Sequence, residues 1–255
     1  MKLFAIVNLT GPNRATSVKK VINKLEKFKD IECFLSKDDS STLFKNESHQ
    51  IDDINTIDYI VSIGGDGTFM LAAKTAIKYN KPLFGINIGR VGYLCKYRQE
   101  EVLKAKSNIF NNLIERKAEL LSIKKDGHKA LALNDFFFLG KNAGHSIEFL
   151  VKTKNKEFDV KASGLIVSTY IGSTAYNKAA GGPMLDKNLS AMVITSICNS
   201  NLTLGSYIVP ITDKIEIYNL REKDEIEIYS DGNLLGTLKD KIIVERSHKY
   251  LRYIE

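Results

Sequence analysis

The string Gly64-Gly65-Asp66-Gly67-Thr68 contains the residue types best suited to chemistry in this sequence. It follows a strand-like run at residues 57–63 and precedes a stretch with helical spacing, which predicts a tight strand-to-helix turn. Glycines let the backbone approach a ligand closely, and amides at a helix N-terminus bind anions. The Asp66 carboxylate can accept a proton or place a metal ion, although it repels phosphate. The string indicates a phosphate-handling loop or, as the plainer alternative, an ordinary turn capped by Asp66.

The elements that must position this loop alternate between strand and helix over the first hundred residues. Apolar runs predict strands at 3–7, 57–63 and 82–86, and helical spacing predicts helices at 18–28 and 68–79. Residues 36–53 are polar and are expected to form a surface connection. This rhythm predicts a parallel sheet covered by helices, with ligands bound at the carboxyl ends of its strands.

Beyond about residue 120 the pattern changes to short runs rich in β-branched and aromatic residues. These runs predict strands at 130–139, 146–153, 165–169, 192–197, 215–220 and 225–229. Asp231-Gly232 is a strong turn signal and predicts a hairpin over 226–238. The expected fold class is α/β plus β. A Rossmann-like domain with a parallel sheet occupies 1–105, and a mostly antiparallel β-sandwich occupies 106–255. The C-terminal tail is a candidate to pack back on the first domain.

Composition and charge exclude several classes of protein. The net charge is +7, but Lys and Arg are spread along the chain without a basic block, which argues against nucleic-acid binding. No apolar run is long enough to span a bilayer. Cys33, Cys95 and Cys198 lie far apart without metal-ligand spacing. We therefore expect no zinc site and no disulfide framework, and we predict a cytoplasmic location.

Four further strings occur in the order and at the spacing of one family. Residues 85–94 read GINIGRVGYL, residues 132–135 read ALND, residues 164–183 read GLIVSTYIGSTAYNKAAGGP, and residues 231–233 read DGN. Together with GGDGT, they resemble the NAD kinase family over nearly the whole chain. At lower similarity, diacylglycerol and sphingosine kinases and 6-phosphofructokinases share GGDGT, so the other strings select the NAD kinases.

The resemblance implies transfer of the γ-phosphoryl group of ATP to the 2′-hydroxyl of the adenosine ribose of NAD. Some members of the family use polyphosphate instead of ATP. Asp66 would receive or orient the proton of that hydroxyl, and amides of Gly65, Gly67 and Thr68 would hold phosphate oxygens. The cofactors are then ATP, NAD and Mg²⁺. The metal would arrive with ATP, with Asp66 as a further candidate ligand, and no protein cage is expected.

The resemblance also assigns residues to nucleotide binding. Asn134 and Asp135 would contact the adenosine of NAD, Tyr176 would lie near bound nucleotide, and Tyr93 would lie near the nicotinamide end. Taken alone, Asn134 is typical of a turn at a strand end, and Tyr176 and Tyr93 are typical of packing residues. The full expected set is Gly64, Gly65, Gly67, Thr68, Tyr93, Asn134, Asp135, Lys161, Ser163, Thr174, Ala175, Tyr176, Asn177, Lys178 and Ala179.

The sequence departs from the family pattern at three positions of this set. Asp135 replaces the usual Glu, and Ala179 stands where Ser is frequent. Ser163 occupies the position of an Asp that is expected to grip NAD from the neighbouring subunit. None of these changes affects Asp66 or its loop, so they predict weaker or retuned NAD binding rather than lost chemistry.

The resemblance implies a homodimer or homotetramer whose NAD sites are shared between subunits. The expected partners are small-molecule nucleotides, with neither nucleic acid nor membrane among them. One alternative is a catalytically weak or inactive NAD(P)-binding homologue that acts as a sensor, which Ser163 and Asp135 motivate. Another is a lipid kinase with the same pentapeptide. It is disfavoured because residues 172–182 match the NAD kinase motif and no exposed apolar helix suggests membrane docking.

Overall fold

The computed structural model describes residues 1–44, 49–51, 53–89, 92–107, 109–110, 113–142, 144–221 and 223–255. The chain divides into two compact units. The first comprises Met1–Ala118 with Leu251–Glu255, and the second comprises Glu119–Tyr250. The division passes through two strands, β6 (Glu115–Lys125) and β17 (Lys241–Ile254), and so lies later than the predicted boundary at residue 105. Among the described residues, we find no helix with the length and apolar character needed to cross a membrane.

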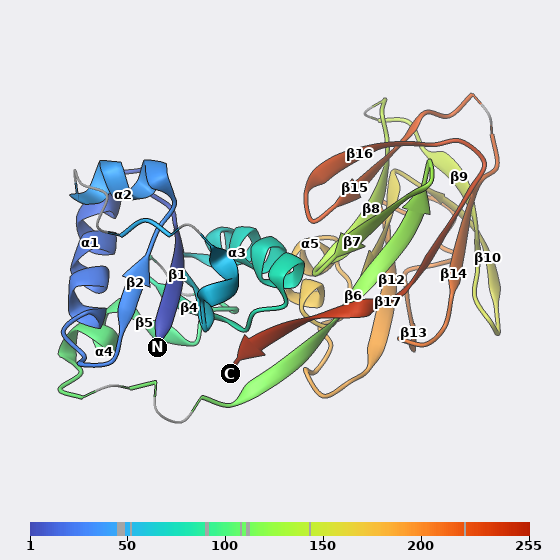
Figure 1. Ribbon diagram of the computed structural model, residues 1–255. Coiled ribbons are helices and arrows are strands. Elements are labelled where there is room, and N and C mark those ends of the chain that lie inside the picture. The colour runs from blue at the N-terminus through green and yellow to red at the C-terminus, as the bar shows by residue number, and fades with distance from the viewer. Residues whose placement is uncertain are drawn as a thin grey trace. The chain divides into compact units, whose positions relative to one another are not determined.

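The first unit is built on a parallel sheet (Figure 1). Its elements are β1 (Lys2–Val7), α1 (Arg14–Leu25), β2 (Glu32–Phe34), α2 (Lys37–Phe44), the 3-10 helix η1 (Ile54–Thr56), β3 (Tyr59–Gly64), α3 (Asp66–Tyr79), β4 (Leu83–Asn87), β5 (Tyr97–Arg98) and α4 (Gln99–Lys104). The strand order is β2-β1-β3-β4, and all of these pairs are parallel. Near the end of β17, Tyr253 pairs in parallel with Leu83 of β4. The predicted α/β character of the first half is confirmed.

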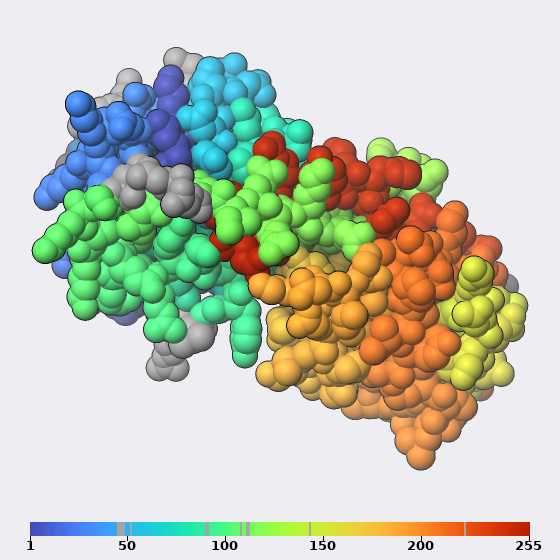
Figure 2. Space-filling view, turned by 90° about the horizontal axis from the view of Figure 1, so that it is seen from below, coloured from blue at the N-terminus to red at the C-terminus, as the bar shows by residue number. Residues whose placement is uncertain are grey.

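Helices cover both faces of this sheet (Figure 1). On one face, Val18 and Ile22 of α1 and Val102 of α4 share a core with the buried side chains of β1, β3 and β4. The segment that contains α4 is green in the surface view of Figure 2. On the other face, α3 buries Phe69 and a row of alanines, whose small side chains let the helix axis approach the sheet. This sandwich of α1, sheet and α3 fixes the start of α3 at the end of β3.

The expected surface connection at residues 36–53 was wrong in part, because residues 37–44 form α2. Its start carries a capping signal in the sequence: the Ser36 hydroxyl accepts the backbone N–H of Asp39 at 3.2 Å and donates to the Asp39 carboxylate at 2.7 Å. Leu43 anchors the helix, since it is buried in the core of the first unit. A Ser-x-x-Asp pattern before an apolar residue indicates a helix start. Residues 45–48 and 52 of this stretch lie outside the described part of the chain.

The second unit contains two sheets. Its elements besides β6 and β17 are β7 (His128–Ala132), β8 (Asp135–Gly140), β9 (Ile147–Lys152), β10 (Glu157–Ala162), β11 (Gly164–Ser168), the 3-10 helix η2 (Gly172–Thr174), α5 (Tyr176–Ala179), β12 (Ala191–Ile197), β13 (Ser206–Pro210), β14 (Ile215–Asn219), β15 (Ile226–Ser230) and β16 (Asn233–Leu238). One sheet has the order β13-β12-β11-β8-β15-β16, and the other contains β10-β9-β14-β17. The pairs within each order are antiparallel.

A shared core joins the two sheets of the second unit. Phe136 and Phe138 of β8 pack in one cluster with Phe149 of β9 and Ile217 of β14, and these four side chains are fully buried. Alternate residues of each strand point into this cluster, as expected for two antiparallel sheets packed face to face. The predicted β-sandwich is confirmed.

The strand predicted at 130–139 is interrupted, which corrects that prediction. The structure has β7 up to Ala132 and β8 from Asp135, with Leu133 and Asn134 between them. The continuous apolar run gives no sign of this break, because the break is caused by a hydrogen-bond partner that is distant in the sequence and is described below. The hairpin predicted at 226–238 is confirmed. Asp231 and Gly232 have φ values of 45° and 80°, the left-handed pair that a two-residue turn needs.

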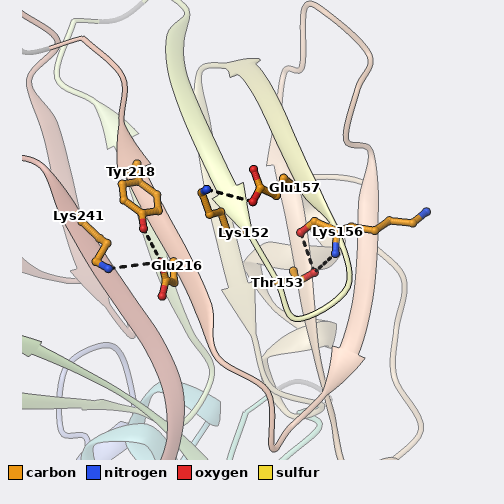
Figure 3. A network of polar contacts seen from close by, with 7 residues as sticks. All are labelled: Lys152, Thr153, Lys156, Glu157, Glu216, Tyr218 and Lys241. Atoms are coloured by element: carbon orange, nitrogen blue, oxygen red, sulfur yellow. Dashed lines mark hydrogen bonds and ion pairs between the residues drawn. The ribbon is translucent and has the colours of Figure 1, made fainter.

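Charged side chains are paired along β9, β10, β14 and β17 (Figure 3). Lys152 lies 3.0 Å from Glu157, and Lys241 lies 3.4 Å from Glu216, which also accepts the Tyr218 hydroxyl. Exposed pairs of this kind contribute about 1 kcal/mol or less each. Their main effect is to offset positive charge locally, which agrees with the absence of a basic block in the sequence.

Candidate functional site

The glycine loop of the first unit lies at the carboxyl end of β3, as predicted. Gly64 ends the strand, Gly65 caps α3 in an extended conformation, and Asp66 is the first helical residue. The first turn of a helix leaves N–H groups without intrahelical acceptors and carries a partial positive charge. The loop therefore presents a carboxylate beside amides that attract anions.

The Asp66 carboxylate is held by the segment that follows β4. One oxygen accepts the backbone N–H of Tyr93 at 3.0 Å and the other accepts that of Leu94 at 3.2 Å. Gly92 passes so close that a Cβ there would lie 2.5 Å from Asp66 Oδ1 and 3.0 Å from Asn87 Nδ2. The GGDGT and GINIGRVGYL strings thus meet at Asp66. Arg90 and Val91 of the second string lie outside the described residues.

The second unit contains a pocket of about 430 Å³. Its lining residues are Asn134, Asp135, Phe137, Leu139, Ala175, Tyr176, Asp231 and Gly232. The volume lies in the range of small-molecule sites, which combine apolar walls with a few polar groups. Four of the predicted nucleotide-binding residues, Asn134, Asp135, Ala175 and Tyr176, are brought together here.

Asp231 organises the polar side of this pocket. Its carboxylate accepts the backbone N–H groups of Leu133 at 2.9 Å, Asn134 at 2.7 Å and Asp135 at 3.2 Å. These amides therefore have a side-chain acceptor and need no neighbouring strand, which is why β7 and β8 are separate strands. The turn between β15 and β16 thus shapes the backbone that carries Asn134 and Asp135.

The opposite side of the same backbone is held by the glycine-rich motif. Thr169 donates its hydroxyl to Leu133 O at 2.6 Å and its backbone N–H to Asn134 O at 2.9 Å. Gly172 approaches so closely that a Cβ there would lie 2.1 Å from Asn134 O. Only glycine fits at this approach, which explains its place in the motif.

Aromatic rings form one wall of the pocket. The Tyr176 ring meets Phe137 edge to face with centroids 5.1 Å apart, and Phe137 stacks on Tyr229 at 4.6 Å. Tyr176 remains 36% exposed. A rigid, half-exposed ring beside polar groups is suited to a flat heterocycle.

Two polar groups in the pocket lack the partners that buried groups usually have. Asn134 Oδ1 is buried and accepts no hydrogen bond from any described residue. The pKa of Asp135 is raised to about 7, first because burial disfavours its charged form and second because the charge of Asp231 is near. An unpaired acceptor and a carboxyl group that titrates near neutrality are features of binding sites.

The raised pKa of Asp135 predicts a pH dependence of stability. Between pH about 4 and about 7 the folded protein keeps this proton while the unfolded chain has lost it. The free energy of unfolding therefore falls as pH rises through this window, with a contribution of up to about 1.4 kcal/mol per pH unit. Urea titrations from pH 4.5 to 8 should show a shallower decline for Asp135→Asn than for the wild type. Equal slopes would contradict the assignment.

The other predicted residues do not line this pocket. Asn177 is fully buried, where its amide donates to Ser173 O and Pro183 O and its oxygen accepts from the Thr195 hydroxyl. The Thr174 hydroxyl donates to Ile171 O, while Lys178 and Ala179 are exposed on α5.

Lys161 lies in β10 and Ser163 connects β10 to β11, and neither residue lines the pocket. Lys161 Nζ is 3.9 Å from Glu148, and Ser163 uses its backbone to bond Ile197 O and Gly140 N. In the first unit, the Tyr93 side chain is 69% exposed and only its backbone reaches Asp66.

Four pocket residues are absent from the predicted set: Phe137, Leu139, Asp231 and Gly232. The sequence marks Asp231 and Gly232 as a turn and as part of a string that resembles a family motif, and neither signal indicates that they line a pocket. Phe137 and Leu139 were absorbed into a strand, because periodicity does not show which face of a strand borders a pocket.

Comparisons with known proteins agree with this geometry. The family models "ATP-NAD kinase N-terminal domain" and "ATP-NAD kinase C-terminal domain" match residues 13–114 and 133–255. An NAD kinase of Neisseria gonorrhoeae is 36% identical over 208 residues, which cover 77% of this chain and 69% of that protein. This chain belongs to the NAD kinase family. An NAD kinase of Clostridium tetani is 30% identical over 91% of this chain and 85% of its own length.

Solved NAD kinase structures share the fold. A crystal structure of an NAD kinase from Archaeoglobus fulgidus in complex with ATP superposes with a TM-score of 0.73 at 23% identity, covering 100% of this chain and 94% of that one. Yeast NADH kinase complexed with NADH gives a TM-score of 0.79 at 19% identity, covering 100% and 83%. Membership of the NAD kinase family makes this chain an enzyme that phosphorylates NAD with ATP, and the lipid-kinase alternative is set aside.

Proposed function

We propose that the pocket of the second unit binds the adenosine end of NAD and that the Asp66 loop carries phosphoryl transfer to its 2′-hydroxyl. The observation that supports the first role most directly is the buried, unpartnered Asn134 Oδ1 beside Asp135 and the Tyr176 ring. The adenine amino group would donate a hydrogen bond to Asn134 Oδ1, and the ribose hydroxyls would donate to the Asp135 carboxylate. The Tyr176 ring would pack against the base.

In the first unit, Asp66 would accept the proton of the attacking hydroxyl. Asp66 is the first residue of α3, so its carboxylate lies at the loop where the hydroxyl would attack. Phosphoryl transfer depends on positioning and charge neutralisation, so a single proton acceptor beside anion-binding amides supplies what the protein must provide.

The residues present fit a Mg²⁺ ion brought by ATP. No group of three or more His, Cys, Asp or Glu side chains able to hold a metal ion occurs in the described part of the chain. Mg²⁺ is commonly bound through one or two carboxylates together with substrate phosphates. Each Asp66 oxygen keeps a further acceptor position beyond its backbone bond, so Asp66 would hold the ion. When bound, the ion would neutralise phosphate charge.

The glycines of the loop differ in the space around them, so their substitution by alanine should have different effects on stability and on ATP binding. A Cβ on Gly64 would lie 2.1 Å from Thr68 Oγ1, whereas a Cβ on Gly65 or Gly67 would meet no atom within 4 Å. Neither of the latter two has a positive φ. Gly65→Ala and Gly67→Ala should therefore change the melting temperature by less than about 3 °C. We expect them to raise the KM for ATP by about tenfold or more, because a methyl group blocks phosphate approach.

Gly64→Ala is the matched control for the fold. It should lower the melting temperature measurably more than the other two substitutions, because Thr68 cannot move without disturbing the first turn of α3. Steady-state kinetics with varied ATP and scanning calorimetry supply both readouts. An unchanged KM for ATP in both Gly65→Ala and Gly67→Ala would contradict phosphate binding at this loop.

The proposed function itself is tested by incubating pure protein with ATP, Mg²⁺ and NAD. NADP is followed with an NADP-specific dehydrogenase, which responds to a 2′-phosphate. Turnover by the wild type and its loss in Asp66→Asn support the assignment. NAD binding without turnover in the wild type would instead favour the sensor alternative.

We further propose a homodimer or homotetramer in the cytoplasm. Resemblance to the family supports the assembly, and the three free cysteines support a reducing compartment. Sedimentation velocity at several protein concentrations tests the assembly, and a single monomeric species would overturn it.

A further inference from the structure

Arg14 reaches from the first turn of α1 to the loop that follows β4. Its Nη2 and Nη1 atoms lie 3.4 and 3.7 Å from the point that a Cβ on Gly89 would occupy. Arg14 begins α1, which is connected to the end of β1. Its side chain therefore spans two loops at the carboxyl edge of the parallel sheet.

The order of the strands places the GGDGT loop between those two loops. β3 lies between β1 and β4 in the sheet, so a side chain that runs from the end of β1 to the end of β4 passes the end of β3. Backbone hydrogen bonds tie the three ends together: Asn8 N–H donates to Ile63 O at 3.4 Å, and Ile88 N–H donates to Gly64 O at 3.1 Å. The guanidinium thus lies at the edge where Asp66 and its glycines begin.

Asn87 links Arg14 to Asp66 more closely. Asn87 Oδ1 accepts the backbone N–H of Gly89 at 2.7 Å. It lies 3.6 Å from the position that a Cβ on Gly89 would occupy, and the Arg14 guanidinium lies beside the same position. Asn87 Nδ2 lies 3.0 Å from the position that a Cβ on Gly92 would occupy, and Asp66 Oδ1 lies beside that second position. The amide group of one asparagine therefore separates the surroundings of the cation from those of the carboxylate.

The Arg14 guanidinium forms no hydrogen bond or ion pair with any residue the structure describes. Other arginines are paired: Arg116 with Glu255, Arg221 with Glu148, Arg246 with Glu119 and Arg252 with Glu115. A half-buried guanidinium has five N–H donors in a rigid fork that matches phosphate oxygens. Its position beside anion-binding amides selects phosphate as the ligand.

We propose that Arg14 binds the terminal phosphates of ATP. This inference rests on the proposed function of the Asp66 loop and names a cation for it. The loop has a chemical difficulty, since the Asp66 carboxylate repels the phosphates that neighbouring amides attract. A guanidinium on the same edge offsets that repulsion and orients the phosphates through bidentate hydrogen bonds.

ATP binding measured by calorimetry tests the proposal without relying on turnover. Arg14→Gln should weaken ATP binding by about 10- to 100-fold, which corresponds to one or two charge-assisted hydrogen bonds. Arg14→Lys should recover part of the affinity, because it restores the charge but not the fork. AMP binding should change by less than about threefold, since the terminal phosphates are absent. The KM for NAD and the melting temperature should stay close to those of the wild type.

Lys20→Gln is the matched control, because Lys20 is exposed on the same helix and the substitution removes the same charge. It should leave ATP affinity unchanged. Unchanged ATP binding in Arg14→Gln, or equal losses for ATP and AMP, would overturn the proposal. Absence of NADP formation by the wild type would instead overturn the proposed function, so the two failures are distinguishable.

Discussion

Asp66→Asn is expected to lower kcat for NADP formation by about 10²- to 10⁴-fold, the contribution usual for a positioned general base. The asparagine side chain has the same shape but cannot take the proton of the ribose hydroxyl. It also keeps only one acceptor oxygen for the two amides of Tyr93 and Leu94, so we expect a loss of about 1 kcal/mol in stability. Initial rates at saturating ATP and NAD, with calorimetric melting temperatures, separate the two effects.

Asp58→Asn is the control, because it also removes a carboxylate that accepts a backbone N–H group. Asp58 precedes the same strand, at its amino end, and accepts the backbone N–H of Lys2 at 2.7 Å. Its substitution should change stability by a similar amount and leave kcat unaffected. If Asp66→Asn keeps more than about a tenth of the wild-type rate, Asp66 does not act as the proton acceptor.

Asp231→Ala is expected to reduce both stability and NAD affinity. The substitution removes the acceptor of the N–H groups of Leu133, Asn134 and Asp135. Each buried amide left without a partner costs about 1–3 kcal/mol. Because water can accept hydrogen bonds from some of the three amides, we expect the free energy of unfolding to fall by about 2–4 kcal/mol. The KM for NAD should rise about tenfold or more, because Asn134 and Asp135 lose their fixed backbone.

The chain contains a closely matched control for this substitution. Asp126-Gly127 forms the turn of the β6–β7 hairpin with φ values of 50° and 78°, near those of Asp231-Gly232. The Asp126 side chain is 80% exposed and pairs with Lys125 at the surface. Asp126→Ala therefore carries the same left-handed backbone penalty, about 1 kcal/mol, without loss of the three amide bonds. Equal destabilisation of the two variants would show that the Asp231 carboxylate does not hold residues 133–135.

Asp231 helps to explain the effect of having Asp135 where the family usually has Glu. A shorter carboxylate at this position stays close to the backbone that Asp231 fixes, where burial and the neighbouring charge raise its pKa to about 7. Removing the charge of Asp231 should lower the pKa of Asp135. The two aspartates thus act as a pair, in which Asp231 fixes the backbone and Asp135 lines the pocket. Ser163 is not among the residues that line the pocket.

Sequence alone determined the features that depend on neighbours in the chain. Apolar spacing predicts the strand and the helix on either side of Asp66, and the glycines between them predict the tight turn; both signals are local. The Asp231-Gly232 turn is equally local, because left-handed φ values favour this residue pair. Local signals also placed most strands of both units.

Tertiary structure decided which of these local pieces act together. Asp231 and Asn134 are 97 positions apart, and they meet because β15 pairs with β8 in the sheet. Arg14 reaches Gly89 because α1 follows a strand that lies two places from β4 in the sheet order. Periodicity determines which side of an element is buried, but not which distant element packs against it. The motif residues were therefore visible in the sequence, whereas the partners that hold them depend on the order of strands in the folded sheets.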